Sequence, residues 1–538
     1  MFTSKLKTIV LIISGGICCP AGISVYAQKA PGDYDYLKKS TPWLTSGNMA
    51  GLSNFTTGSL SFAESYVRKD NGRFINYFES DNSYQYGVNA ESFYRLNSKL
   101  VFYGSITYSN FTGKNMGGTS SIDPGYNSFN MDEYADSTAG KKQKETYGLS
   151  GGFSTQLLEK LYGGLKVDYQ TVSYFKTKDL RHANDLLDMT VSGGLKYTVK
   201  NHLQVGFNYS YRRTSEEIVF SSAGNKDQEF NTLIDYGLFL GKQERFGDMG
   251  TGYTVSGDKK PYSNRFHGVS IQGEYQSGRY AYFNEIGYQN RSGYFGVKSS
   301  TAVVFMENSG NIYNYRGVFT IQSGDSHHQI EGNIQHETNK NEENSFQRST
   351  TDGGVTTVTY YGKNAVGNKK NTEASINYTG NISVKQDVPN WVINGEIRLF
   401  ERRQTAIYYP LYRKQNIHLY SGSIAAKRNF IKGKHIAGPY LSGLFAKGGG
   451  GLKTDGIYTS GTSTTTKAVS LDHLLVREYE YLTADRVSAA GGFRYTEILP
   501  ANKMSVYADV CFRFTKAFSI SQTGDTFRSL SIRIGCTF

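Results

Sequence analysis

The last ten residues of the chain, SLSIRIGCTF (residues 529–538), alternate between polar and apolar side chains up to the final position. Successive side chains of a β-strand point to opposite faces, so this segment predicts a strand with one apolar and one polar face. The apolar face carries Leu530, Ile532, Ile534, Cys536 and Phe538. One such strand does not decide a fold. It indicates the fold of the whole chain only if the rest of the sequence repeats the pattern.

The same two-faced pattern recurs from about Ser59 to the end of the chain. It is clear in residues 161–170, 189–198, 203–212, 269–275, 391–399, 487–496 and 505–514. Alternation over ten or so residues is the length at which a tilted strand crosses a membrane. The chain also has 42 Tyr, 31 Phe and 60 Gly but only 9 Pro, and a mean hydropathy of −0.48. This composition is typical of membrane strands, which need apolar residues only at every second position and aromatic residues at both interfaces.

The connections between these segments give a second indication, because they alternate between short and long. Short links lie at residues 96–99, 158–160, 199–201, 276–278, 323–325, 388–390 and 499–502, and polar stretches lie near residues 114–143, 214–264, 338–370 and 447–483. Barrels of the outer membrane have short periplasmic turns and long outer loops. We therefore expect an all-β fold, a transmembrane antiparallel up-and-down barrel of about 18 strands, with 16 as the alternative. We expect its outer loops to be solvated and mobile.

The N-terminus has the features of a secretory signal peptide. Lys5 and Lys7 precede an apolar core at residues 9–13, and Val25, Tyr26 and Ala27 form a small-residue cleavage site. A lipoprotein signal ending at Cys18 or Cys19 is the alternative, although residues 15–17 fit it poorly. The expected organisation is a signal peptide at residues 1–27, cleaved after Ala27, a periplasmic N-terminal segment at 28–58, and the barrel at 59–538.

Phe538 is expected to end the closing strand, which pairs with the first strand so that no strand edge faces lipid. Here the sequence resembles bacterial outer-membrane proteins, which commonly end in an alternating strand with a terminal Phe that the insertion machinery reads. The residues that carry this resemblance are Leu530, Ile532, Ile534 and Phe538. The Tyr- and Gly-rich strands also resemble porin-like outer-membrane barrels of Bacteroidota.

The resemblance implies a location in the outer membrane of a Gram-negative bacterium. The implied partners are outer-membrane lipid and lipopolysaccharide, periplasmic chaperones and the barrel-insertion machinery, together with outer-membrane proteins or lipoproteins. Nucleic acid is not an expected partner. Loss of Lys5 and Lys7 lowers the net charge from +13 to +11, and no clustered basic run remains.

No motif of the sequence points to a reaction. It has no P-loop, no paired Cys motif and no helical His pair. His328 and His336 share a strand face, but eight residues separate them by about 26 Å, too far for one metal ion. Ser263 and His267 are close in sequence, yet such proximity is common by chance in a Ser-rich chain. We expect no enzyme, no catalytic residue, no metal site and no cofactor.

The polar faces of the strands are expected to line the lumen. Charges of both signs fall on these faces, at Lys166, Asp168, Lys196, Arg212, Glu274, Glu285, Glu396, Arg398, Arg494, Asp509, Arg513 and Arg533. Charged groups need water or a partner charge. The pattern therefore fits either a wet pore for polar solutes, with a basic surplus that favours anions, or a network of ion pairs across the lumen.

Residues 42–52, which precede the first strand, are expected to form a plug or lid inside the barrel. This stretch resembles the N-terminal Asn-Pro-Ala plug of the long-chain fatty-acid channel family, with Met49 where that family has Pro. The candidate plug residues are Trp43, Asn48, Met49 and Leu52. The predicted function is a passive or gated channel for small polar or charged solutes. The alternative is a non-conducting accessory barrel in a larger outer-membrane complex for nutrient uptake, secretion or barrel assembly.

Overall fold

The computed structural model describes residues 32–133, 138–223, 230–246, 252–255, 259–458, 469–499 and 504–538. The expected signal peptide, its cleavage at Ala27 and the first residues of the expected N-terminal segment lie outside these ranges. No helix in the described part of the chain is long and apolar enough to cross a membrane.

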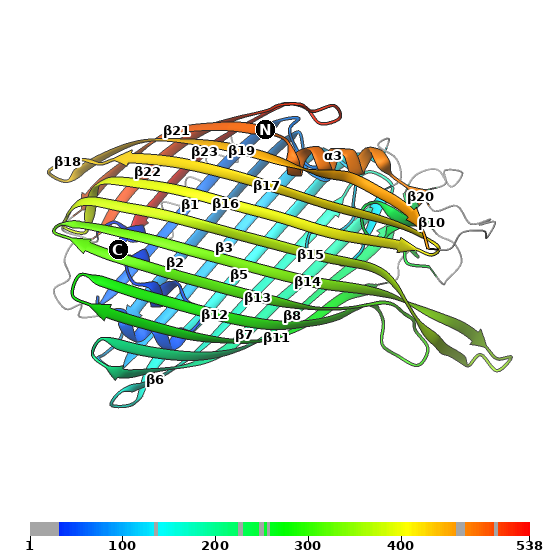
Figure 1. Ribbon diagram of the computed structural model, residues 1–538, viewed down its shortest axis with the longest axis horizontal. Helices are drawn as coiled ribbons and strands as arrows, with labels where there is room; N and C mark the ends of the chain where they lie inside the picture. Colours follow the sequence, from blue (N-terminus) through cyan, green and yellow to red (C-terminus); the bar gives the residue numbers. More distant parts are fainter. Residues whose placement is uncertain are drawn as a thin grey trace.

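Eighteen antiparallel strands form one closed barrel (Figure 1). Each strand pairs with the next one in sequence, and the last barrel strand pairs with the first. The barrel strands are β1 (Ser59–Gly72), β2 (Asn82–Arg95), β3 (Leu100–Met116), β5 (Gly140–Leu158), β6 (Leu161–Lys176), β7 (Arg181–Lys200), β8 (Leu203–Ser221), β11 (Lys260–Ser277), β12 (Tyr280–Gly296), β13 (Val304–Ser323), β14 (Ser326–Thr350), β15 (Thr356–Lys385), β16 (Val388–Tyr408), β17 (Leu411–Arg428), β19 (His435–Ile457), β21 (Arg486–Leu499), β22 (Met504–Ala517) and β23 (Thr526–Thr537). A short strand, β18 (Phe430–Lys432), pairs only with β19. The predicted fold and the number of 18 strands are confirmed.

The barrel closes through the stretch that ends the sequence. β23 pairs with β1 from Phe62 opposite Thr537 to Gly72 opposite Phe527. At the end of the ladder the Phe538 N–H donates to the Ser61 carbonyl at 2.9 Å, and the Ser61 N–H donates to the Phe538 carbonyl at 2.8 Å. The backbone groups of the first and last strands are therefore satisfied by each other, as a wall inside lipid requires.

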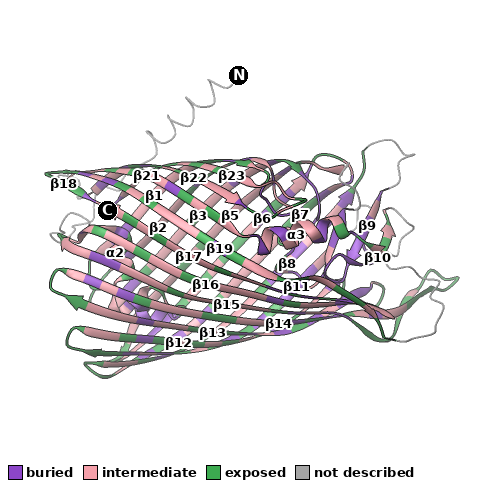
Figure 2. Cartoon of the chain, turned by 45° about the horizontal axis from the view of Figure 1, so that its top comes forward, coloured by how far each residue is buried: buried purple, intermediate pink, exposed green. Residues whose placement is uncertain are grey.

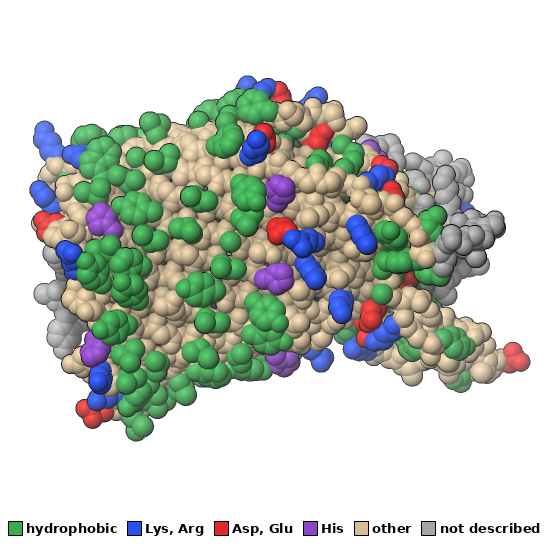
Figure 3. Space-filling view, in the orientation of Figure 1, with side chains coloured by type: hydrophobic (Ala, Val, Ile, Leu, Met, Phe, Trp, Pro, Cys, Tyr) green, Lys and Arg blue, Asp and Glu red, His purple; other side chains and the backbone are tan. Residues whose placement is uncertain are grey.

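Alternation places apolar side chains on the outside of the wall. Leu530, Ile532, Ile534 and Phe538 are all exposed, as are large apolar residues of the other strands such as Ile397. Figure 3 shows hydrophobic side chains spread over the middle of one face, with Lys and Arg more frequent toward its ends. An outer wall of this kind is stable only where lipid rather than water surrounds it.

The two ends of the barrel differ. At one end the strands are joined by tight turns, and the turn between β15 and β16 lies at Gln386 and Asp387, both with positive φ, rather than at residues 388–390. At the other end several connections are long, although β16 and β17 are joined there by only two residues, Tyr409 and Pro410. The expected loop at residues 338–370 is mostly strand, because β14 and β15 extend past the barrel and pair as a hairpin up to Thr350 and Thr356.

Three of the long connections fold together at this outer end, which corrects the expectation of solvated loops. They supply a second, four-stranded sheet of β4 (Asn130–Glu133), β9 (Asn231–Asp235), β10 (Leu240–Arg245) and β20 (Val469–Ser470), followed by helix α3 (Asp472–Thr483). We call this unit the outer lid. Its apolar core includes Leu233, Ile234, Leu474 and Leu475, and buried residues gather around it in Figure 2. The lid is ordered because these side chains leave water when the loops pack.

An arginine placed on the lipid face should destabilise the barrel far more than a change at the neighbouring lumen position. Ile397 is 69% exposed and lies on β16 midway along the wall. Ile397→Arg is expected to lower the free energy of unfolding in lipid vesicles by about 2–4 kcal/mol. Arg398→Gln removes only a half-exposed ion pair with Glu373, so its effect should be below about 1 kcal/mol. Urea titration of both variants checks this, and equal effects would contradict the assignment of the two faces.

Candidate functional site

Residues 32–55 lie inside the barrel at the end with the tight turns, and we call them the lumen segment (Figure 1). Three short helices shape it: α2 (Tyr34–Lys39), the 3-10 helix η1 (Pro42–Thr45) and the 3-10 helix η2 (Met49–Asn54). The Asp33 carboxylate caps α2 by accepting the Tyr36 N–H at 3.1 Å. The Asn48 side chain caps η2 by accepting the Ala50 N–H at 3.0 Å. Polar residues at these caps therefore set where each helix begins.

Glycines on the inner faces of neighbouring strands form the seat of the lumen segment. A Cβ added at Gly164 of β6 would fall on the backbone of Ala50, and one added at Gly194 of β7 would fall on the Asn48 side chain. A Cβ at Gly206 of β8 would come within 2.8 Å of the Trp43 ring. The segment can lie directly against the wall only because these positions lack side chains.

Polar contacts fix the centre of the segment to this seat. The Asn48 side-chain amide donates to the carbonyls of Leu195 and Phe207 at 3.0 and 3.1 Å, and to the Gln272 side chain at 3.0 Å. The Trp43 indole N–H donates to the Glu274 carboxylate at 2.8 Å. The buried N–H groups of Asn48 and Trp43 therefore all have acceptors, so none of them is left without a hydrogen bond away from water.

A second anchor holds α2 through one carboxylate of the wall. Glu91 of β2 accepts hydrogen bonds from Tyr34, from Lys38 at 2.7 Å and from Tyr103 of β3 at 2.8 Å. Apolar packing supports it, since Met49, Leu52 and Tyr34 share a buried cluster with Phe93 of the wall. The segment is therefore attached to the barrel mainly by side chains, together with one backbone hydrogen bond from the Asp33 N–H to the Asp387 carbonyl at 2.9 Å, and it pairs with no strand.

Above the lumen segment, cavities of about 590 and 560 Å³ lie between polar faces of the strands. Their lining is rich in Ser, Thr, Asn and Gln, and both include Lys166 and Asp168. We call this region the chamber. Glu285, Glu396 and Arg398 line the first cavity, and Arg212 lines the second.

The basic residues of the chamber are paired along the wall with carboxylates of close neighbours. Lys166 lies 3.0 Å from Asp168 on the same strand, and Arg212 lies 2.6 Å from Asp188 of the adjacent strand. Arg316 and Arg398 pair in the same way with Glu331 and Glu373 of adjacent strands. In none of these pairs does a side chain reach across the lumen, so the charges are neutralised without filling the chamber.

The remaining predicted lumen residues lie closer to the ends. Lys196 donates to Asn54 of the lumen segment, and Glu274 accepts from Trp43. Arg513 lines a cavity near the outer lid. Asp509 lies 3.6 Å from Arg494, and Arg494 and Arg533 line a separate pocket next to α2.

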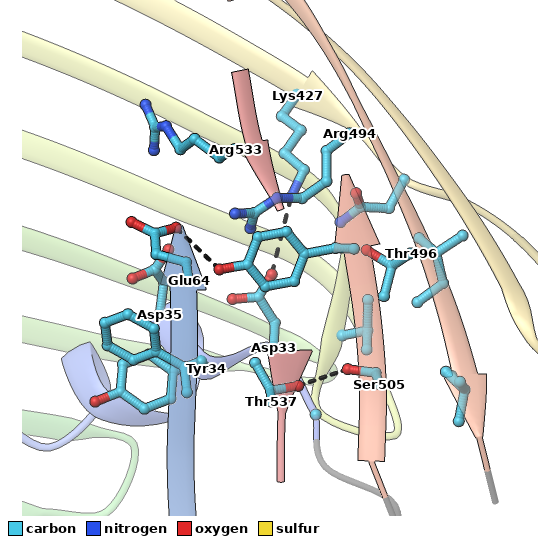
Figure 4. A pocket seen from close by; sticks show the side chains of 17 residues that line it. Asp33, Tyr34, Asp35, Glu64, Lys427, Arg494, Thr496, Ser505, Arg533 and Thr537 are labelled. Carbon is cyan, nitrogen blue, oxygen red and sulfur yellow. Dashed lines mark hydrogen bonds and ion pairs between the residues drawn. The ribbon is translucent and has the colours of Figure 1, made fainter. Parts of the chain in front are cut away.

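This separate pocket lies where the barrel closes, and we call it the seam pocket (Figure 4). Its volume is about 190 Å³. The lumen segment contributes Asp33, Tyr34 and Asp35, and the wall contributes residues of β1, β17, β19, β21, β22 and β23. The lumen segment therefore contacts the wall closely at β5–β8 but leaves a polar space at the seam.

Several residues of the site carry no signal in the sequence that singles them out. Gln272, Glu91 and Lys427 fall on polar strand faces like many other residues, and alternation gives the face but not the depth along the barrel. The glycines of the seat are three among 60. Only the register between neighbouring strands brings these residues together.

His328 and His336 lie on the outer wall of the barrel, each beside a residue of the neighbouring strand. His328 shares a hydrogen bond of 2.9 Å with Tyr378, and His336 shares one of the same length with Thr372. In the described part of the chain, no three His, Cys, Asp or Glu side chains are placed to hold a metal ion.

A closed barrel with an apolar outer wall, a polar lumen and a segment of its own chain inside defines a membrane-spanning β-barrel. Residues 49–538 match the model of a family of unknown function, DUF6850, and the chain belongs to that family. A search of curated proteins finds no match to the sequence.

Solved structures give a more distant likeness. The ferric preacinetobactin receptor BauA of Acinetobacter baumannii matches at 8% identity and a TM-score of 0.38, over 89% of this chain and 79% of that one. The outer membrane transporter YddB of Escherichia coli matches at 7% identity and a TM-score of 0.38, over 89% and 81%. The toluene transporter TodX of Pseudomonas putida matches at 9% identity and a TM-score of 0.29, over 91% and 92%. At these values the likeness assigns neither activity nor solute to this chain.

Proposed function

We propose that this protein is a channel in the outer membrane of a Gram-negative bacterium, that it passes small polar or charged solutes, and that the lumen segment gates it as a plug. The observation that carries the proposal is the manner in which the segment is held. Side-chain hydrogen bonds and a glycine seat attach it, and no strand of the barrel wall includes it. Such a segment can leave its seat while the barrel stays closed.

The energetics of the anchors suit a gate. Each neutral hydrogen bond contributes only about 0.5–1.5 kcal/mol net, because water replaces the partner when the bond opens. Asn48 makes neutral bonds of this kind, whereas Trp43 and the helix α2 donate to the carboxylates of Glu274 and Glu91 in bonds of about 1.5–3 kcal/mol each. A conformational change needs states that differ by a few kcal/mol. Each single anchor is in that range, so loss of one or two of them can shift the segment between states, whereas the backbone ladder of the wall is far more stable.

The lining of the chamber favours the passage of polar rather than apolar solutes. Its basic residues are paired along the wall, as at Lys166 with Asp168, and the rest of the lining carries hydroxyl, amide and carboxylate groups. A charged wall is stable where water reaches it. We propose no enzymatic activity.

Solute flux into vesicles tests the proposal. The mature chain is reconstituted into lipid vesicles, and entry of a labelled small sugar and a labelled small anion is followed. Entry is expected to be slow with the intact chain and at least about tenfold faster once the segment is unseated by Asn48→Ala together with Trp43→Ala. Gly151→Ala is the matched control, because a Cβ at Gly151 meets nothing within 4 Å. Equal, negligible entry for all variants would sink the channel hypothesis.

A non-conducting accessory barrel is the second candidate, and one specific observation favours it. The lumen segment lies at one end of the barrel, and the outer lid, with its own apolar core, lies at the other. A barrel that holds polypeptide at both ends suits a role as partner of another outer-membrane protein or lipoprotein. Stable co-purification of one defined partner, with no flux even after the segment is unseated, would favour this function.

A further inference from the structure

The seam pocket separates positive from negative charge. Lys427 of β17, Arg494 of β21 and Arg533 of β23 lie on one side of it, and Asp33, Asp35 and Glu64 of β1 lie on the other. Figure 4 shows the three basic side chains in the upper part of the pocket and the three acidic ones below them. The pocket therefore offers two opposite charges to one small volume.

One charge on each side lacks a protein partner. Arg533 and Asp35 form no hydrogen bond and no ion pair with any other residue that the structure describes. The other charges are at least partly engaged: Glu64 accepts the Tyr507 hydroxyl at 3.0 Å, and Lys427 lies 3.9 Å from Asp33. Two unpaired charges of opposite sign that face the same pocket can both be satisfied by a ligand that carries both signs.

The volume limits the size of that ligand. Pockets for drug-sized ligands measure about 300–1,000 Å³, whereas the seam pocket measures about 190 Å³. Hydroxyls of Thr496, Ser505 and Thr537 complete the lining and can donate to a carboxylate or accept from an ammonium group. The ligand should therefore be small as well as dipolar.

We propose that the seam pocket binds zwitterionic α-amino acids or dipeptides, with the carboxylate on Arg533 and the ammonium group on Asp35. The inference deepens the proposed function and rests on it for its purpose, since the pocket would bind solutes that reach the edge of the plug. A simple anion fits less well, because Asp35 and Glu64 would face it as like charges. A simple cation meets the same difficulty at Arg533 and Arg494.

Calorimetric binding to the mature chain in detergent tests the proposal with four probes. They are dialanine, N-acetyl-dialanine, dialanine amide and N-acetyl-dialanine amide, which carry both charges, the anion, the cation and neither. Dialanine is expected to bind, and the loss of either charge to weaken binding about tenfold or more, as for a charge-assisted hydrogen bond. The fully blocked probe should not bind.

Variants assign each charge to its residue. Arg533→Gln should weaken dialanine to the level of dialanine amide, and Asp35→Asn should weaken it to the level of N-acetyl-dialanine. Asp35→Glu should restore binding. Arg513→Gln is the matched control, because Arg513 also lies in the lumen but lines a different cavity. Heat-modifiable gel mobility confirms that each barrel is folded.

The outcomes separate this inference from the proposed function. Binding of N-acetyl-dialanine as tight as that of dialanine would replace the zwitterion site with an anion site and overturn the inference. Absence of dialanine binding would also overturn it, even if vesicle flux shows that the protein is a channel. Binding that depends on Arg533 and Asp35 in a protein without flux would support the pocket and refute the channel.

Discussion

Deletion of residues 28–54 is expected to turn a silent barrel into a conducting one. These residues include the three short helices of the lumen segment but end before β1, so the closed wall is left whole. In a planar bilayer the intact chain should give no steady current, because the segment and its anchors fill the end with the tight turns. The truncated chain should give stable single-channel steps, since an 18-strand barrel leaves room for an aqueous channel.

A substitution in the seat should have the same effect without removing any residue. In Gly164→Val the new side chain occupies the position of the Ala50 backbone, so the segment cannot dock. Gly151→Val is the control on the neighbouring strand, where nothing lies within 4 Å of the added Cβ. Conductance with Gly164→Val but not with Gly151→Val is the expected result. A silent truncated barrel would show that the segment is not what closes the pore.

Tryptophan fluorescence reports the position of the segment directly. The chain has two tryptophans, and Trp43 is buried in the lumen while Trp391 lies exposed on the outer wall. Trp391→Phe leaves Trp43 as the single reporter. Its emission should be blue in the seated state and shift to the red with Gly164→Val, because the indole then meets water. An unshifted emission in a conducting variant would place the gate elsewhere, for example in the outer lid.

The barrel wall could be predicted because its signal is local. Alternation within ten residues marks a strand, and the closing role of Phe538 follows from the need to pair every edge in lipid. The strand number and the closed topology are confirmed. The tight turn expected at residues 388–390 lies slightly earlier because Gln386 and Asp387 adopt positive φ, which alternation does not indicate.

The outer lid could not be predicted, because its partners are far apart in sequence. β4 pairs with β9 about a hundred residues later, and β10 pairs with β20 more than two hundred residues later. The sequence does contain one indication of the lid, because Leu233, Ile234 and Leu474 are apolar residues within stretches expected to be solvated loops. Apolar residues in a loop indicate burial, but sequence alone does not choose among distant partners.

In the lumen, too, the features that depend on neighbouring residues could be predicted and those that depend on distant strands could not. Alternation selects which residues face inward, such as Lys166 and Arg212, but pairing depends on depth and register. Lys166 and Asp168 lie two residues apart on one strand, so alternation alone brings them together, whereas the pair Arg212 with Asp188 depends on the register between two strands. Trp43 was expected in the plug and Glu274 on the lumen face, but their contact, like that of Asn48 with Gln272, depends on the fold.

The outer lid is expected to loosen as pH rises through neutrality. Asp132 of β4 and Asp235 of β9 are buried together in its core. Burial raises the pKa of Asp235 to about 7, although the Gly237 N–H partly opposes the shift. Burial and the neighbouring Asp235 also raise the pKa of Asp132 well above its ordinary value. Arg402 offers little compensation, because it is engaged by Glu478 of α3 at 2.7 Å.

The direction in which lid stability changes with pH follows from the difference in pKa between the folded and unfolded states. A carboxyl whose pKa is higher in the folded lid than in the unfolded chain stabilises the lid fully below about pH 4, and this contribution is lost as pH rises through about 7. For Asp235 alone, the loss between pH 5 and pH 8 should be about 2–3 kcal/mol. Amide hydrogen exchange of residues 130–133 and 231–235, corrected for its intrinsic pH dependence, should therefore show weaker protection at pH 8.

Two variants isolate the cause. Asp235→Asn keeps an acceptor for the Gly237 N–H but cannot ionise, so the loss of lid stability between pH 5 and pH 8 should shrink by the contribution of Asp235 and leave only that of Asp132. Asp472→Asn is the control, because Lys453 holds the pKa of that lid carboxyl below its ordinary value and it stays ionised throughout this range. It should leave the pH dependence unchanged. If Asp235→Asn keeps the full dependence, Asp235 is not the group that loosens the lid, and Asp132 and Glu79, whose pKa values burial also raises, become the next to test.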